Sequence, residues 1–232
     1  MESIGLGVAW YVILILSLTF HEAAHALAAK QGGDLTAYHG GQVTLDPIPH
    51  IRRAPIGTIL IPIISYAAAG WMIGWASTPY DPYWAQRYPR RAALMSLAGP
   101  AANLFLVLIA ALAIRMGVGG GLFEAPDRII FTQVTTAVST GGWQGAATLL
   151  SILFSLNLIL FVFNLIPVPP LDGSGVPPLF LSDESASKYL HITRQPGLSF
   201  LGFLIAWQLF NPVFRPIHLF AINLLYPGAH YG

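Results

Sequence analysis

The chain contains no cysteine and few charged residues. None of its 232 residues is Cys, and Asp, Glu, Lys and Arg together make up 9% of it, whereas soluble domains carry about 25%. The absence of cysteine excludes disulfides and thiolate ligands, so any metal site must be built from His, Asp or Glu. The scarcity of charge excludes a fully water-exposed surface, because too few polar side chains remain to cover the apolar ones.

Apolar residues are abundant instead. They make up 55% of the chain, and the mean hydropathy is +0.63. A lipid bilayer must therefore cover much of the surface, and we expect an all-α integral membrane protein. The net charge of +1 and the lack of a basic run give no sign of nucleic-acid binding. The length predicts one membrane-embedded domain over residues 1–232, with a core at 4–175 and C-terminal apolar helices at 197–227.

Five apolar segments are candidates for membrane insertion, which requires roughly 20 mostly apolar residues. They cover about residues 4–29, 56–75, 92–114, 146–166 and 198–226. The first begins without the Lys or Arg of a signal peptide, so we interpret it as a membrane segment. Pro212, Arg215 and Pro216 interrupt the last segment, which is either two short helices or one kinked span. The sequence thus predicts a polytopic helical bundle with about 4–6 membrane segments.

Lys and Arg are distributed unevenly between these segments. Only Arg115 and Arg128 lie between segments three and four. Eight others lie between segments one and three or after segment four: Lys30, Arg52, Arg53, Arg87, Arg90, Arg91, Lys188 and Arg194. The positive-inside rule then places the N-terminus outside and the Arg-rich loops in the cytosol, provided that segment 56–75 enters the bilayer and returns. A complete crossing by that segment would largely remove the bias.

A group of polar residues lies inside the first apolar segment. His21 and His25 are four residues apart, so on a helix they lie on one face and can reach one zinc ion. Glu22 is rotated off that face, where it can take a proton from a water on the metal. This is the H-E-x-x-H pattern of zinc hydrolases. The alternative is a polar cluster bonded to a neighbouring helix, but ionisable groups in a bilayer cost a few kcal/mol and usually have a function.

A zinc site of this kind needs a third protein ligand and an open position for water. Asp172 is the best candidate, because it follows the prolines of N-L-I-P-V-P-P-L-D-G at residues 164–173, which end a helix and let the chain turn back. From spacing alone, Asp172 could equally cap a surface turn. His50, in T-L-D-P-I-P-H, is the rival ligand. Asp46 in the same stretch is expected to be a turn residue before Pro47.

Three motifs together resemble a known family. They are H-E-A-A-H at residues 21–25, S-L-A-G-P-A-A-N at 96–103 and N-L-I-P-V-P-P-L-D-G at 164–173. Their identity and order resemble the site-2 protease family of intramembrane zinc metalloproteases. The stretches V-T-L-D-P-I-P-H-I and G-T-I-L-I-P further resemble its short members, which lack PDZ and CBS domains.

The resemblance implies a function and a set of site residues. It implies one zinc ion bound by His21, His25 and Asp172, with Glu22 as general base and Asn103 and Asn164 as polar supports. The substrate would be a transmembrane helix of another protein, in a bacterial-type cell membrane with the active site toward the cytosol. Asp46 and Arg52 depart from the pattern of the short members, which leaves the role of this loop and of His50 open. The alternative function is a metal-binding membrane protein, a transporter or inactive relative, although mere binding would not need Glu22.

The position of the motifs also bears on the topology. His21 lies about 17 residues after Ile4, or roughly 26 Å along a helix, so it is near the exit side of the bilayer. Asp172 lies just past the exit of segment four. The two can meet only if segments one and four run parallel, so segment two must not cross. Pro62, Gly70 and Gly74 permit a break within it. We expect this segment and the loop at 42–50 to pair with an unwound substrate as an added strand.

Overall fold

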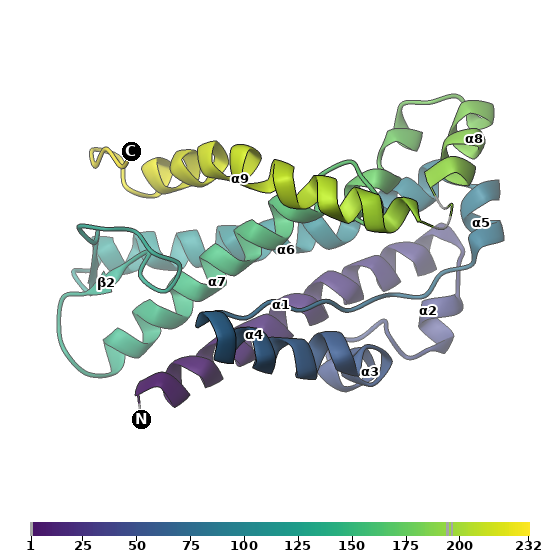
Figure 1. Cartoon of the computed structure of the whole chain (residues 1–232). Helices are drawn as coiled ribbons and strands as arrows, with labels where there is room; N and C mark the ends of the chain where they lie inside the picture. The colour runs from purple at the N-terminus through teal and green to yellow at the C-terminus, as the bar shows by residue number, and fades with distance from the viewer. Residues whose placement is uncertain (1, 194, 196) are drawn as a thin grey trace.

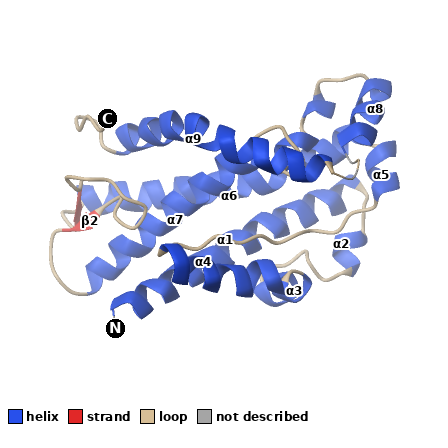
Figure 2. Cartoon of the chain, in the orientation of Figure 1, coloured by secondary structure: helices blue, strands red, loops and turns tan. Residues whose placement is uncertain are grey.

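Four long apolar helices form most of the structure. The computed structural model describes residues 2–193, 195 and 197–232. Within this range, the helices long and apolar enough to span a membrane are α1 (Glu2–Gly32), α6 (Pro89–Gly119), α7 (Gly142–Asn164) and α9 (Leu198–Leu225). Helix dominates the chain, and the strands lie at one end of the bundle (Figure 2). The predicted all-α polytopic fold is therefore confirmed.

The remaining elements are short and lie in the connections. They are α2 (Thr36–His39), α3 (Pro47–Arg53), the π-helical turn η1 (Ile56–Leu60), α4 (Ile61–Ala69), α5 (Pro82–Arg87), the antiparallel strands β1 (Phe123–Glu124) and β2 (Thr136–Ala137), the 3-10 turns η2 (Asp172–Gly175) and η3 (Pro177–Leu179), and α8 (Asp183–Thr193). Asp46 caps α3 by accepting a hydrogen bond from the backbone of Ile48, so it is the turn residue that the sequence predicts.

The long helices alternate in direction. α1 and α7 run toward the end of the bundle that carries α2, α5 and α8, whereas α6 and α9 run away from it (Figure 1). We call this end the loop end. The parallel course of α1 and α7, inferred above from the need to bring Asp172 to His21, is thus observed. It places the C-terminal end of α7 beside the polar face of α1.

Segment 56–75 reverses its direction within the structure, and its return without crossing a bilayer stays a prediction. Its helical part, η1 with α4, ends at Gly70, whose φ of 75° is in the left-handed region that favours glycine. The chain then runs back in extended form to α5 at the loop end (Figure 1). We call residues 70–81 the return segment. The two legs are joined by a hydrogen bond of 3.1 Å from the Trp75 nitrogen to the Gly57 oxygen.

Small residues bring α1 close to α6. Ala26 and Ala29 on α1 and Ala93 on α6 are fully buried. One apolar cluster then joins α1, α7 and the return segment, with Leu14, Met72 and Ile152 at its centre. A second joins α6, α7 and α9. α6 and α7 therefore form the scaffold on which α1 and the loop after α7 are held.

The last helix is the most exposed of the four. α9 is one continuous helix although Pro212 and Pro216 lie inside it, so the structure resolves the choice that the sequence left open. Only 17% of its most apolar stretch is buried, compared with 50% for α7. Exposed side chains such as Phe200 and Phe220 lie along it. In a bilayer these would face lipid, because exposed aromatic rings are stable there.

Candidate metal centre

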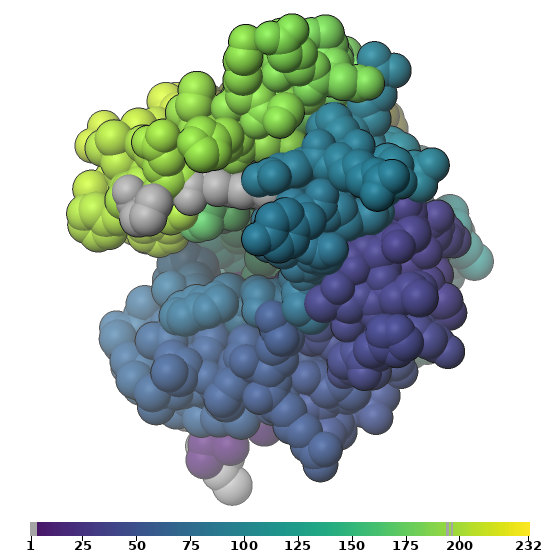
Figure 3. Space-filling model, turned by 90° about the vertical axis from the view of Figure 1, so that its right-hand side faces the viewer, coloured from purple at the N-terminus to yellow at the C-terminus, as the bar shows by residue number. Residues whose placement is uncertain are grey.

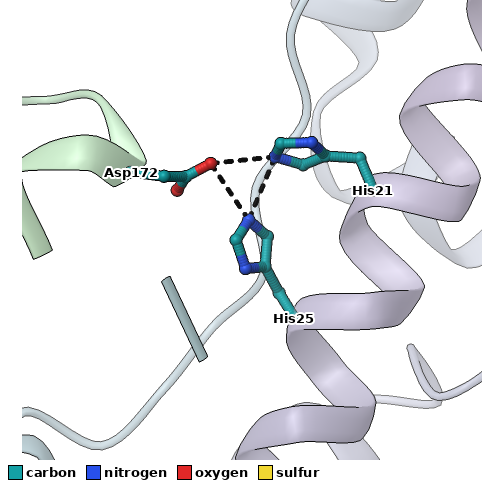
Figure 4. Close-up of side chains that lie close together, drawn as sticks. All are labelled: His21, His25 and Asp172. Carbon is teal, nitrogen blue, oxygen red and sulfur yellow. Dashed lines mark hydrogen bonds and ion pairs between the residues drawn. The ribbon is translucent and has the colours of Figure 1, made fainter. Parts of the chain in front are cut away.

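Two histidines and an aspartate converge inside the bundle. His21 and His25 are buried on one face of α1, with their Nε2 atoms 3.0 Å apart. The Oδ2 atom of Asp172 lies 3.1 Å from the first of these nitrogens and 3.3 Å from the second. Figure 4 shows the three side chains pointing toward one another from α1 and from η2. The convergence that the sequence predicts for these three residues is therefore observed.

The loop after α7 brings the carboxylate to this position. α7 ends at Asn164, and the proline-rich stretch that follows leads into η2, which begins at Asp172. Gly173 and Gly175 allow close packing there: a methyl group on Gly173 would collide with the Leu165 oxygen, and one on Gly175 with Ser96 of α6. Tyr189 of α8 donates a 2.9 Å hydrogen bond to the Ser174 oxygen. The aspartate is thus held between three helices.

The protons of both imidazoles can be located from their partners. Nδ1 of His21 lies 2.6 Å from the side-chain oxygen of Asn103. Nδ1 of His25 lies 2.7 Å from the backbone oxygen of Met95. Both partners are acceptors, so in the neutral rings both Nδ1 atoms carry the proton and both Nε2 atoms present a lone pair. Such outer hydrogen bonds are the usual support of histidine ligands to a metal.

The donor set fits a zinc ion. Two nitrogen lone pairs and a carboxylate oxygen meet without a proton between them, an arrangement that a cation stabilises. Asp172 Oδ2 is buried and has no hydrogen-bond donor in the described part of the chain. Zinc bonds of about 2.0–2.1 Å in a tetrahedral site separate ligand atoms by about 3.3 Å, close to the distances seen here. A methyl group on Gly99 would collide with both Nε2 atoms, so this glycine keeps the space beside them open.

Glu22 is buried beside these residues, but its carboxylate contacts the return segment and not the two histidines or Asp172. Its Oε2 atom accepts a 2.7 Å hydrogen bond from the hydroxyl of Thr78, on the return segment. The same hydroxyl lies 3.0 Å from the backbone oxygen of Glu22. The carboxylate is therefore kept off the face of the two histidines, as expected for a residue next to His21 in a helix. Glu22 also lines the cavity beside the site.

A cavity of about 1020 Å³ opens over the site. Glu22, Asp172 and both histidines line it, together with the return segment, α7, α8 and the first half of α9. Many of the lining side chains are large and apolar, among them Trp71, Trp75, Phe163, Phe203 and Trp207. Viewed from the loop end, the surface is hollowed between the part with α8 and α9 and the part with α3 and α4 (Figure 3). The size and the apolar lining of the cavity suit an apolar peptide segment.

The three suggested support residues have different environments. Asn103 contacts His21 directly, as the resemblance implied. Asn164 lines the cavity, but its amide donates to the Leu160 oxygen of its own helix at 2.9 Å. His50 is neither one of the converging ligand residues nor part of the cavity lining in the described chain, so the alternative of His50 as a ligand is wrong. Its ring is buried in α3, where Nε2 lies 3.1 Å from the Thr44 oxygen and stabilises its own loop.

Three further residues of the site were not singled out for this role from the sequence. Gly99 lies within the S-L-A-G-P-A-A-N motif, where it leaves room at the histidines. Asn157 is an amide in an apolar helix, a signal that could have been followed, since polar residues at membrane depth usually have a partner. Thr78 lies in a Ser-Thr-Pro stretch with no local pattern. Its role depends on a contact with a residue 56 positions away.

The fold and the site together define a class: a multi-pass helical membrane protein with an H-E-x-x-H metal centre completed by an aspartate. Within that class, the chain belongs to Peptidase family M50, whose sequence profile matches residues 9–207. This confirms the resemblance to the site-2 proteases.

Three curated proteins are similar to the chain over most of its length. "Putative zinc metalloprotease YwhC" of Bacillus subtilis (strain 168) is 37% identical over 70% of this chain and 64% of that protein. "Putative zinc metalloprotease Rip2" of Mycolicibacterium smegmatis is 29% identical over 74% of the chain and 56% of that protein. Rip2 of Mycobacterium tuberculosis (strain H37Rv) is 31% identical over 81% and 62%. The chain thus spans less than two thirds of the length of these relatives. No solved structure matches it significantly.

Proposed function

We propose that the chain is an intramembrane zinc metalloendopeptidase that hydrolyses peptide bonds in or near transmembrane helices of other proteins. The observation that carries this proposal is the meeting of two histidine lone pairs and the Asp172 carboxylate beside Glu22, inside a bundle of apolar helices. The names of the relatives, all zinc metalloproteases, support it. A buried glutamate beside the ligands favours catalysis over simple metal binding, which needs no base.

In this proposal one zinc ion is held by His21, His25 and Asp172. Bound zinc supplies Lewis acidity, which polarises a carbonyl group and makes water nucleophilic near neutral pH. Glu22 takes the proton from the attacking water and later delivers it to the leaving amine. Because Thr78 donates to Oε2, the Oε1 atom of Glu22 is the one left for this proton transfer. General acid–base catalysis of this kind typically contributes a factor of about 10²–10⁴.

The return segment is the proposed binding surface for the substrate. A helical substrate keeps its carbonyl groups in hydrogen bonds, so it must unwind before water can attack one of them. The return segment is extended, lines the cavity and carries Thr78, which contacts Glu22. We propose that the unwound stretch pairs with this segment as an added strand, so that its side chains enter the apolar cavity. The loop at 42–50 adjoins it, because Gln42 donates to the Ser77 oxygen at 3.4 Å.

We further propose that the loop end faces the cytosol of a bacterial-type cell. Most of the basic residues lie between α1 and α6, and this part of the chain starts and finishes at the loop end. Arg115 and Arg128 lie toward the opposite end of the bundle. Arg194, which the sequence count also included, lies outside the described residues. Because the chain has no native cysteine, the variants Arg53→Cys and Arg87→Cys can be labelled in intact cells. Both should react only after the membrane is permeabilised, and Arg128→Cys before.

Hydrolysis can be tested with the purified chain in detergent and a labelled transmembrane substrate. Chelation should stop cleavage, one equivalent of zinc should restore it, and mass spectrometry should place the cut in or near the apolar stretch. Cleavage that survives complete removal of the metal would contradict the proposal. So would a zinc-loaded chain that transports zinc into liposomes but cuts none of a panel of transmembrane substrates, which is the result expected of a metal transporter.

A further inference from the structure

A chain of buried polar side chains connects three membrane helices to one of the histidines. It consists of Ser17 on α1, Asn157 on α7, Asn103 on α6 and His21 on α1. The serine and the two asparagines are 0% exposed. Amides at this depth are costly unless their hydrogen bonds are satisfied. Among these three side chains, Asn103 is the one with a hydrogen bond to a side chain of the metal centre, so the other two have no direct part in the function proposed above.

The direction of the first hydrogen bonds is fixed by the backbone. The Asn157 Nδ2 atom lies 2.8 Å from the Leu153 oxygen, a carbonyl that can only accept. It also lies 2.9 Å from the Ser17 hydroxyl, whose own proton goes to the Ile13 oxygen at 2.7 Å. The amide nitrogen of Asn157 must therefore face these groups. Rotating the amide by 180° would place the Asn157 oxygen against the Leu153 and Ser17 oxygens, which is unfavourable.

The remaining bonds follow from this orientation. The Oδ1 atom of Asn157 faces α6 and accepts from the Asn103 nitrogen at 2.9 Å. The oxygen of Asn103 is then the atom that faces His21, at 2.6 Å from Nδ1. An oxygen there requires the proton of the neutral ring on Nδ1. His25 has no such chain, since its Nδ1 faces the Met95 backbone oxygen directly.

We propose that Asn157 and Ser17 are positioning residues that, through Asn103, hold His21 in the tautomer whose Nε2 lone pair is free for the metal. The inference rests on the metal binding proposed above. Neutral histidine can carry its proton on either nitrogen, and the wrong tautomer would place a hydrogen where the metal binds. Substitution of such outer partners typically lowers metal affinity about 10–100-fold.

The first test is made on the zinc-free wild-type protein, labelled with ¹⁵N at histidine. The His21 signals are assigned by their loss in His21→Gln. We expect Nδ1 of His21 to be protonated and Nε2 unprotonated. In Asn157→Leu, which keeps the branching of the side chain but removes the hydrogen bonds, the His21 signals should move toward a mixture of tautomers. The His25 signals should stay unchanged, because a backbone carbonyl holds that ring. If Asn157 only stabilised the fold, its substitution would not change the His21 signals while leaving the His25 signals unchanged.

The second test is zinc affinity, measured by competition with a chelator. Asn157→Leu should bind zinc about 10–100-fold more weakly, and Ser17→Ala should show a smaller loss. Asn103→Leu combined with Asn157→Leu should lose no more than Asn103→Leu alone, because both act through one contact. The matched control is Ser155→Ala, a fully buried serine on the same helix that has no hydrogen-bond partner in the described chain. It should leave the affinity unchanged.

The outcomes separate this inference from the proposed function. A wild-type chain that binds no zinc would overturn both. A wild-type chain that binds zinc while its zinc-free form carries the His21 proton on Nε2 would overturn the inference alone, whether or not the variants fold. Equal zinc affinity of the wild type and a folded Asn157→Leu would also overturn the inference alone.

Discussion

Two walls enclose the cavity, and they are held in different ways. The first wall carries the histidines and Asp172 on α1 and η2, which pack against α6 and α7 and are connected by buried hydrogen bonds. The second wall consists of the return segment and α9. The return segment is extended, and α9 is mostly exposed: 17% of the apolar stretch of α9 is buried, compared with 50% for α7.

This difference separates two requirements of the proposed reaction. A metal site needs ligands held in place before the metal arrives, and buried, fully bonded side chains provide this. Admission of a substrate helix needs a wall that can open, and segments with few buried contacts open at low cost. Substitutions that disturb the ligands or their supports in the first wall should therefore lower zinc binding, whereas those in the second wall should lower turnover with zinc still bound.

The largest effect is expected at Gly99 in the first wall. In Gly99→Ala the added methyl group would collide with Nε2 of both histidines, so zinc binding and hydrolysis should both be lost. Metal analysis of the purified protein measures this. Gly119→Ala is the matched control, because it lies on the same helix and a methyl group there meets nothing within 4 Å. A Gly99→Ala chain with a full equivalent of zinc would contradict the assignment.

A smaller effect is expected at Thr78 in the second wall. Thr78→Val removes the donor to Glu22 and keeps the shape, so kcat should fall roughly tenfold or more with little change in KM or zinc content. Thr78→Ser should restore most of the rate, since it returns the hydroxyl. The neighbouring Ser77→Ala serves as control. If Thr78→Val lost zinc together with activity, the two walls would not be functionally distinct.

The smallest effect is expected at Asp34, which joins the two walls at the loop end. Its carboxylate accepts from the nitrogen and hydroxyl of Thr36, at 2.9 and 2.6 Å, and from the Asp81 nitrogen at 2.8 Å. Burial alone would raise the pKa of Asp34, but these hydrogen bonds hold it below its ordinary value. A lowered pKa stabilises the fold above the ordinary value near 3.9, and this stabilisation is lost as the pH falls through the folded pKa.

Asp34→Asn should therefore lower the free energy of unfolding by about 1–2 kcal/mol at neutral pH, and by less below pH 4. Denaturant titration in detergent at both pH values measures the difference. Asp46→Asn, the exposed cap of α3, should cost less at neutral pH. An equal cost for Asp34→Asn at both pH values would show that its charge does not stabilise the junction.

The sequence predicted the first wall better than the second. His21, Glu22 and His25 follow from helical spacing, and the parallel course of α1 and α7 follows from the need to bring in Asp172. The course of segment 56–75 followed from charge and from that same requirement. By contrast, the contact of Thr78 with Glu22 and the bond of Asn157 to Ser17 join residues 56 and 140 positions apart. Such contacts depend on tertiary packing and have no local pattern. His50 was considered as a ligand because the sequence does not show that its imidazole pairs with the Thr44 oxygen.

The central claim is that three residues of the first wall bind zinc and that Glu22 acts on the substrate without binding the metal. Its most direct test is zinc per chain and hydrolysis of one transmembrane substrate, measured together on the wild type, Glu22→Gln and His25→Ala. We expect one zinc and hydrolysis in the wild type, one zinc without hydrolysis in Glu22→Gln, and neither in His25→Ala. Full hydrolysis by Glu22→Gln, or a full equivalent of zinc in His25→Ala, would contradict the claim.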